Sequence, residues 1–133
     1  MSFSENAHVR IMGVVPDEEK LAAIARSRAL VMPSRHESLS MVVLEAWMME
    51  RPVLVNGDCE VLRGQVLRAD GGLYYRRYEE FAASLDRLMG APELADALGR
   101  QGHAYFQENY AWERIMEKYE RLMGIAAGGG GRG

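Results

Sequence analysis

The sequence lacks several features that mark specialised classes of protein. A single cysteine, Cys59, among 133 residues excludes an internal disulfide and a cysteine-rich metal site. The histidines His8 and His103 have no partner ligands at metal-binding spacing, so no metal is expected. The formal net charge of −3 provides no basic face of the kind that nucleic-acid-binding proteins carry, so a nucleic-acid partner is not expected either.

Long hydrophobic runs are absent too. Runs such as Met41–Leu44 are far shorter than a membrane span, so no transmembrane segment is expected. The first ten residues lack the basic start and the apolar stretch of a signal peptide. With 48% hydrophobic and 26% charged residues, the composition is that of a soluble globular domain, and the length suits one domain and not two. We therefore expect a cytoplasmic protein.

Short apolar runs alternate with amphipathic stretches along the chain. The run Val9–Val15 is rich in β-branched residues and predicts a strand that ends at Pro16. Asp17 is predicted to cap a helix that reaches about Arg28. Further strands are predicted at Ala29–Met32, Val53–Val55 and Leu73–Tyr75. Further helices are predicted at Ser40–Met49, at Glu60–Leu67, around Phe81–Met89, from Pro92 to about Gln107, and from Trp112 to Met123.

Strands that alternate with helices predict parallel pairing through right-handed crossovers, and therefore an α/β fold with a sheet of about four strands. We expect one domain over residues 1–125 and a disordered glycine-rich tail over residues 126–133. In such sheets, ligands bind at the carboxyl ends of the strands. That rule indicates three loops: Val15-Pro16, Pro33–Leu39 and Asn56–Glu60.

The most informative segment is PSRHESLSMVVLEAW, which contains Glu37 in a loop and Glu45 on the following helix. Free N–H groups at the helix start, near Ser40, can bind an anion such as a diphosphate. Carboxylates can accept hydrogen bonds from vicinal hydroxyls. The pattern therefore suits a nucleotide-sugar. From the residues alone, a plain helix cap with a surface glutamate explains it equally well.

Other chemistries have less support in the sequence. The phosphate-binding glycine motifs of dinucleotide-binding domains and P-loop proteins do not occur. Glycoside hydrolases also use two carboxylates, but nothing beyond this pair indicates a hydrolytic cleft. His36 is either a plain loop residue or a group that polarises a leaving phosphate. Asp58 and Glu60 lie in a loop that faces the site, although turn formation alone explains Asp58.

Six segments in fixed order resemble a known family. They are GVVPD, ALVMPSRHES, LSMVVLEAW, RPVLVNGDCE, GGLYY and NYAWERIMEKYERL. Together they are similar to the carboxy-terminal, donor-binding domain of retaining GT-B-fold glycosyltransferases of family four, also called glycosyltransferase group 1. The resemblance covers about Val9 to Met123. It implies a Rossmann-like parallel sheet flanked by helices.

The resemblance also implies roles for individual residues. Glu45 would bind the ribose hydroxyls of the donor, and Glu37, the candidate catalytic residue, would lie beside the donor sugar. The Val14-Val15-Pro16 turn, with Val15 as the candidate binding residue, would flank the nucleobase. The family commonly has a Gly-Phe-Gly-like stretch where this chain has Ser38-Leu39-Ser40, and this leaves the donor open. The backbone contacts to sugar and phosphates would come from Ser38, Leu39, Ser40, Met41 and Val42.

The implied activity is transfer of a sugar, with retention, from a nucleotide-diphosphate sugar to an acceptor, as in polysaccharide biosynthesis. No cofactor or metal is implied. Family members also carry an amino-terminal acceptor domain and two earlier strands, so we expect this chain to be incomplete and inactive alone. The complete enzyme is expected in the cytoplasm or at the membrane periphery. The alternative is a non-catalytic module that binds a nucleotide or a partner, and the intact Glu37 and Glu45 favour the enzyme.

The absent strands leave the sheet with a predicted gap. The family sheet has the order 3-2-1-4-5-6, and this chain would lack the central first and second strands. Either Val9–Val15 pairs with Ala29–Met32 in their place, or two chains join edge to edge as a homodimer. The apolar surface left by the missing helices favours the homodimer.

Overall fold

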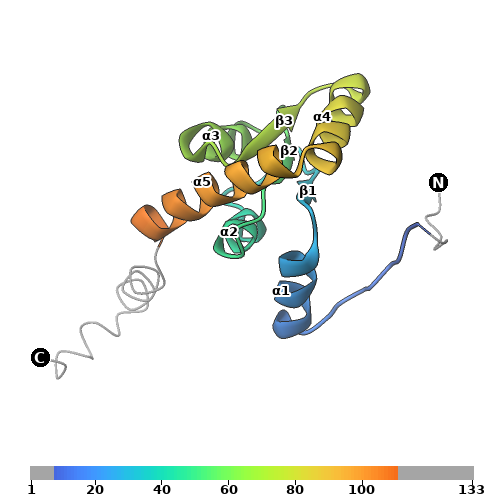
Figure 1. Ribbon diagram of the computed structural model, residues 1–133, viewed down its shortest axis with the longest axis vertical. Helices are drawn as coiled ribbons and strands as arrows, with labels where there is room; N and C mark the ends of the chain where they lie inside the picture. Colours follow the sequence, from blue (N-terminus) through green and yellow to red (C-terminus); the bar gives the residue numbers. More distant parts are fainter. Residues whose placement is uncertain (1–7, 111–133) are drawn as a thin grey trace, which may run out of the picture.

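The computed structural model describes residues 8–110, which form a three-stranded sheet and five helices (Figure 1). Strands and helices alternate up to the last two helices, which follow one another. In chain order the elements are α1 (Asp17–Arg26), β1 (Leu30–Met32), α2 (Met41–Met48), β2 (Val53–Asn56), α3 (Glu60–Ala69), β3 (Gly72–Tyr75), α4 (Tyr78–Gly90) and α5 (Pro92–Tyr110).

The sheet is parallel, with the order β1-β2-β3. Every residue of the central strand β2 is buried, which explains its continuous apolar sequence, because helices cover both faces of such a sheet. The edge strand β1 is only half-buried, because it has a neighbouring strand on one side alone in the described sheet. The α/β fold class is confirmed, with three strands in the described residues where about four were predicted.

The strand predicted at Val9–Val15 is wrong. The described part of the chain before α1 forms no strand and lies apart from the sheet (Figure 1). Met12 is 60% exposed and Val14 fully exposed. A β-branched run becomes a strand only when a neighbour accepts its hydrogen bonds. Since β1 pairs with β2 alone in the described sheet, the predicted pairing of Val9–Val15 with Ala29–Met32 is wrong as well.

The helix boundaries differ from the predictions by small margins. Pro16 occupies the N-cap position of α1, and Asp17 is its first helical residue. The helix α3 is longer than predicted and ends at Ala69, because Asp70 adopts a left-handed conformation with φ of 51°. The helix predicted at Trp112–Met123 and the glycine-rich tail lie outside the described residues.

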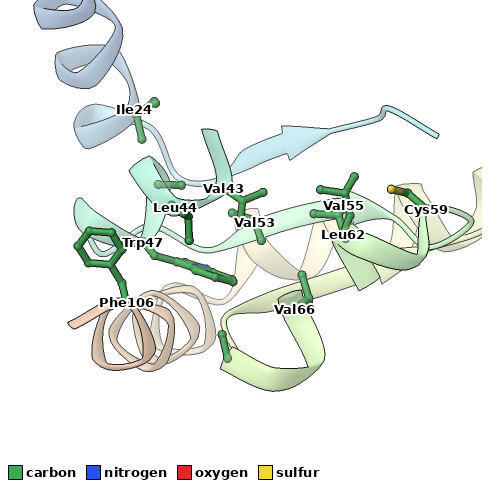
Figure 2. Close-up of a cluster of buried hydrophobic side chains, with 12 residues drawn as sticks. Ile24, Val43, Leu44, Trp47, Val53, Val55, Cys59, Leu62, Val66 and Phe106 are labelled. Carbon is green, nitrogen blue, oxygen red and sulfur yellow. The ribbon is translucent and has the colours of Figure 1, made fainter. Parts of the chain in front are cut away.

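Trp47 is the centre of the larger hydrophobic cluster, between α2 and α5 (Figure 2). Its side chain is fully buried, and its indole Nε1 donates to the carbonyl oxygen of Gly71 over 3.0 Å. A Cβ on Gly102 would lie 2.2 Å from the Trp47 ring, so only glycine lets α5 approach this closely. A smaller cluster contains Leu54, Leu88, Ala95 and Leu98. Trp47 thereby fixes one end of α2 while the other end faces the carboxyl edge of the sheet.

Candidate functional site

Asn56 holds together the two loops that follow β1 and β2. Its Nδ2 donates to the carbonyl oxygen of Pro33 over 3.1 Å, and its Oδ1 accepts from the backbone N–H of Asp58 over 2.9 Å. The residue is 8% exposed, so these hydrogen bonds lie in surroundings where an unpaired amide would be costly. One buried side chain therefore sets the spacing between the loops.

Gly57 fixes the second loop to the rest of the sheet. Its N–H donates to the carbonyl oxygen of Tyr75 over 2.6 Å, and its own carbonyl accepts from Arg63 Nη1 over 2.5 Å. A Cβ at this position would lie 2.7 Å from the Tyr74 ring. The turn predicted at Asn56-Gly57-Asp58 is confirmed, and it leaves Asp58 exposed at the sheet edge.

The two loops border a cavity of about 600 Å³ that is open to solvent. Glu37 and Ser38, both predicted site residues, lie on its wall, together with the candidates Asp58 and Glu60. Carboxylates accept hydrogen bonds from hydroxyl groups, so this cavity suits a polyhydroxylated ligand such as a sugar. A larger hollow of about 790 Å³ along β3 includes none of the predicted site residues. The smaller cavity is lined by Arg35, His36, Glu37, Ser38, Asp58, Cys59, Glu60 and Val61.

Ser40 is the N-cap of α2, and it is almost fully buried. Its hydroxyl accepts from the N–H of Val43 over 3.2 Å, and its own N–H donates to Gln65 Oε1 over 3.4 Å. The Ser40 amide, one of the predicted phosphate contacts, is therefore already bonded within the fold. The amides of Met41 and Val42 lie in the first helical turn, where a helix has no intrahelical acceptor for them.

Glu45 lies on α2 and forms an ion pair with α1. Its Oε2 is 3.1 Å from Lys20 Nζ, and Lys20 also lies 3.5 Å from Asp17 Oδ1. The hydrogen bond with Glu45 raises the pKa of Lys20, so the amine is charged at neutral pH. The second carboxylate oxygen of Glu45, Oε1, is buried and has no hydrogen-bond partner.

The structure places the predicted residues in two groups. Glu37 and Ser38 line the cavity, whereas Glu45 is not part of its wall and faces α1 instead. The side chains of Leu39 and Met41 are exposed, and Val42 is half-buried. Val15 is half-buried just before α1.

Sequence reasoning missed three residues of this region: Lys20, Asn56 as a link between loops, and Gln65. An asparagine directly after the apolar run Val53–Val55 was a signal that could have indicated Asn56. The amide of Gln65 is buried with its Nε2 unpaired, although nothing in the helical pattern of α3 marks it. The role of Lys20 depends on how α1 packs against α2, which no local pattern shows.

No group of three or more His, Cys, Asp or Glu side chains able to hold a metal occurs within residues 8–110. That the chemistry needs neither a metal nor a cofactor stays a prediction. None of the five described helices is both long and apolar enough to cross a membrane.

Comparison with known proteins decides the family. The family model described as "Glycosyl transferases group 1" matches residues 3–105, which is more than half of the chain. The chain belongs to this family. Glycosyltransferase 1 domain-containing protein 1 of Xenopus tropicalis is 31% identical over 118 residues, and the match covers 86% of this chain and 33% of that protein.

A solved structure supports the fold of this group 1 glycosyltransferase domain. Sucrose-phosphate synthase from Thermosynechococcus elongatus superposes with a TM-score of 0.71 at 24% identity. The superposition covers 86% of this chain and 30% of the synthase chain. The likeness shows the α/β fold of a GT-B glycosyltransferase. The chain thus spans about a third of the length of each of these two proteins.

Proposed function

We propose that this domain binds a nucleotide-diphosphate sugar and supplies the donor site of a retaining glycosyltransferase. The observation that carries the proposal is the cavity at the carboxyl edge of the sheet, where Glu37 lies beside the start of α2. Membership of the glycosyl transferases group 1 family supports sugar transfer as the reaction.

Each part of the donor has a proposed place. The sugar occupies the carboxylate-lined cavity, in which Glu37 accepts hydrogen bonds from sugar hydroxyls. The diphosphate lies at the start of α2, where the amides of Met41 and Val42 and the helix dipole favour negative charge. The ribose lies against Glu45, and Val15 flanks the base.

Transfer itself is proposed to need a second, acceptor-binding domain. The chain covers 33% and 30% of the two proteins compared above, so residues outside it are available in those proteins for acceptor recognition. We also propose a cytoplasmic location, with polysaccharide biosynthesis as the broad process. We also propose a homodimer that forms through the edge of β1. Sedimentation across a concentration series tests this proposal. A chain that stays monomeric at every concentration contradicts the homodimer.

Calorimetric titration of UDP, GDP and ADP, and of sugar derivatives of each, into the 133-residue chain tests the donor site. At least one nucleoside diphosphate should bind. The isosteric change Glu45→Gln should weaken its binding by about 1.5–3 kcal/mol, the range for hydrogen bonds to a charged group. The matched control is Glu108→Gln, which removes a charge from an exposed position on α5 and should leave affinity unchanged.

Glu37→Gln separates the sugar from the nucleotide. It should weaken sugar-bearing donors and leave the bare diphosphate unaffected, because Glu37 lines the cavity and Glu45 does not. If no nucleotide binds a folded chain, the donor-site proposal is wrong. If nucleotides bind and both sugar-bearing and bare forms respond equally to Glu37→Gln, the cavity is not the sugar site.

A further inference from the structure

The ion pair between α1 and α2 presents two kinds of hydrogen-bonding group side by side. Lys20 Nζ and Glu45 Oε2 are 3.1 Å apart and come from different helices. The Lys20 side chain is 36% exposed and that of Glu45 is 21% exposed, so both remain within reach of a ligand. Since Glu45 Oε1 is buried, a ligand that approaches the carboxylate from solvent meets Oε2, and therefore also meets the ammonium group.

From this geometry we infer that Lys20 is a second ribose-contacting residue, which recognises the vicinal diol of the nucleotide together with Glu45. The inference rests on the proposed function, because it places the ribose at Glu45. It adds a donor of hydrogen bonds to a site that otherwise offers the ribose only an acceptor.

The chemistry of the hydroxyl group explains why such a pair is suited to a diol. A hydroxyl both donates and accepts, an ionised carboxylate only accepts, and an ammonium only donates. At the observed separation, one hydroxyl can donate its proton to Oε2 and accept from an N–H of Lys20 at ordinary hydrogen-bond lengths. The neighbouring hydroxyl can use another N–H of Lys20, which has three.

The surroundings of Lys20 leave its N–H groups able to donate to the hydroxyl groups of a ligand. Its other partner, Asp17, is 3.5 Å away and its side chain is 88% exposed, so that contact is weak and readily exchanged. The contact with Glu45 is shorter and keeps the amine charged, since it raises the pKa of Lys20. A lysine that only attached α1 to α2 would be indifferent to the hydroxyl groups of a ligand.

The test compares nucleotides with and without the ribose diol. UDP, GDP and ADP and their 2′,3′-dideoxy counterparts are titrated into the 133-residue chain and into Lys20→Met and Lys20→Arg. Lys20→Met should weaken the ribonucleotide that binds by about tenfold, the scale of one charge-assisted hydrogen bond, and leave its dideoxy counterpart nearly unchanged. Lys20→Arg retains a charged donor and should restore most of the discrimination between the two.

The matched control is Arg26→Met, which removes a positive charge from an exposed position on the same helix. It should leave the preference for the diol intact, and so separate a local contact from a general attraction for phosphate. Circular dichroism verifies that each variant is folded. Because Lys20 is partly exposed, we expect all of them to fold.

Three outcomes overturn the inference. Equal weakening of ribo- and dideoxynucleotides by Lys20→Met would assign Lys20 a structural role only. Tighter ribonucleotide binding by that variant would mean that Lys20 competes with the ribose for Glu45. An unchanged affinity would mean that Lys20 makes no contact. In each case wild-type binding that depends on Glu45 leaves the proposed function standing, whereas a wild-type chain that binds none of the nucleotides removes both.

Discussion

Two turns at the carboxyl edge of the same sheet are built in different ways. Between β3 and α4 the chain turns within two residues, and Glu80 Oε1 accepts from the N–H groups of Arg76 and Arg77 over 2.7 and 3.2 Å. Between β1 and α2 the chain makes a loop of eight residues, which borders the cavity. Close to this second turn, Glu45 Oε1 and Gln65 Nε2 are buried without partners.

The difference separates a turn that stabilises the fold from one that can receive a ligand. Glu80, in the first turn of α4, accepts from the N–H groups of the two residues that precede the helix, which closes this turn tightly. Glu45 on α2 and Gln65 on α3 each keep an unpaired buried atom. Such groups lower stability, and proteins tolerate them chiefly where function requires them. The fold can accept this because the other end of α2 is fixed by Trp47.

Removing that anchor should have the largest effect on stability. Trp47→Ala deletes a fully buried indole and should lower the free energy of unfolding by about 3–5 kcal/mol. That is a large part of the 5–15 kcal/mol typical of a domain. Urea unfolding followed by circular dichroism measures the change. A loss below about 1 kcal/mol would mean that α2 is held in place by other contacts.

A second variant identifies the cause of that loss. Gly102→Ala places a Cβ against the Trp47 ring and should itself destabilise by about 1–3 kcal/mol, the cost of overpacking. In the double variant the added methyl group occupies part of the vacated space. The loss in free energy of unfolding of the double variant should therefore be smaller than the sum of the two single losses, since the effects of substitutions at contacting residues are not additive.

Ser40→Ala should have a smaller effect, at the polar end of the same helix. It removes the acceptor of the Val43 N–H, and the loss of an N-cap costs about 1 kcal/mol. It should also weaken nucleoside diphosphates more than nucleosides, because the start of α2 is the proposed phosphate site. Ser84→Ala, within α4, is the control and should change neither quantity. Equal weakening of both ligands would contradict a phosphate site here.

At the other turn, Glu80→Gln should change the pH dependence of stability and leave nucleotide binding unaffected. The N–H groups of Arg76 and Arg77 hold the pKa of Glu80 below its ordinary value of 4.5. A carboxyl with a lowered folded-state pKa contributes stability above its unfolded pKa and loses it as the pH falls through the folded value. Wild type and variant should therefore differ most at neutral pH and converge in acid.

Unfolding measured from pH 7 to pH 2 tests this convergence. Glu79→Gln, in the first turn of the same helix, is the control for a general change in net charge. If the stability difference between wild type and Glu80→Gln were constant over this range, Glu80 would not act through its charge.

The smallest effect is expected at Val14, in the segment that precedes α1. The residue is fully exposed, so Val14→Thr should change stability by less than about 0.5 kcal/mol. Val55→Thr, in the fully buried strand β2, should cost clearly more, because a buried hydroxyl needs a partner. Similar losses of stability in Val14→Thr and Val55→Thr would show that the segment before α1 packs against the sheet in solution.

The sequence alone determined the α/β fold, the three strands that pair, and the loop that contains Glu37. These features follow from short-range properties: apolar runs, turn residues and helix caps are set by neighbours in the chain. The same patterns placed Ser40 at the start of α2 to within one residue. Where a pattern needed a distant partner, as at Val9–Val15, it predicted a strand that the described sheet does not contain.

Only the tertiary structure decided which side chains meet. Lys20 and Glu45 lie on different helices, Ser40 and Gln65 are 25 residues apart, and Trp47 packs against a glycine of α5. No local periodicity specifies such pairs, because each depends on how the helices pack on the sheet. The placement of Glu37 and Glu45 in two different surroundings has the same cause. Their spacing placed one in a loop and one on a helix, but packing directed Glu37 to the cavity and Glu45 to α1.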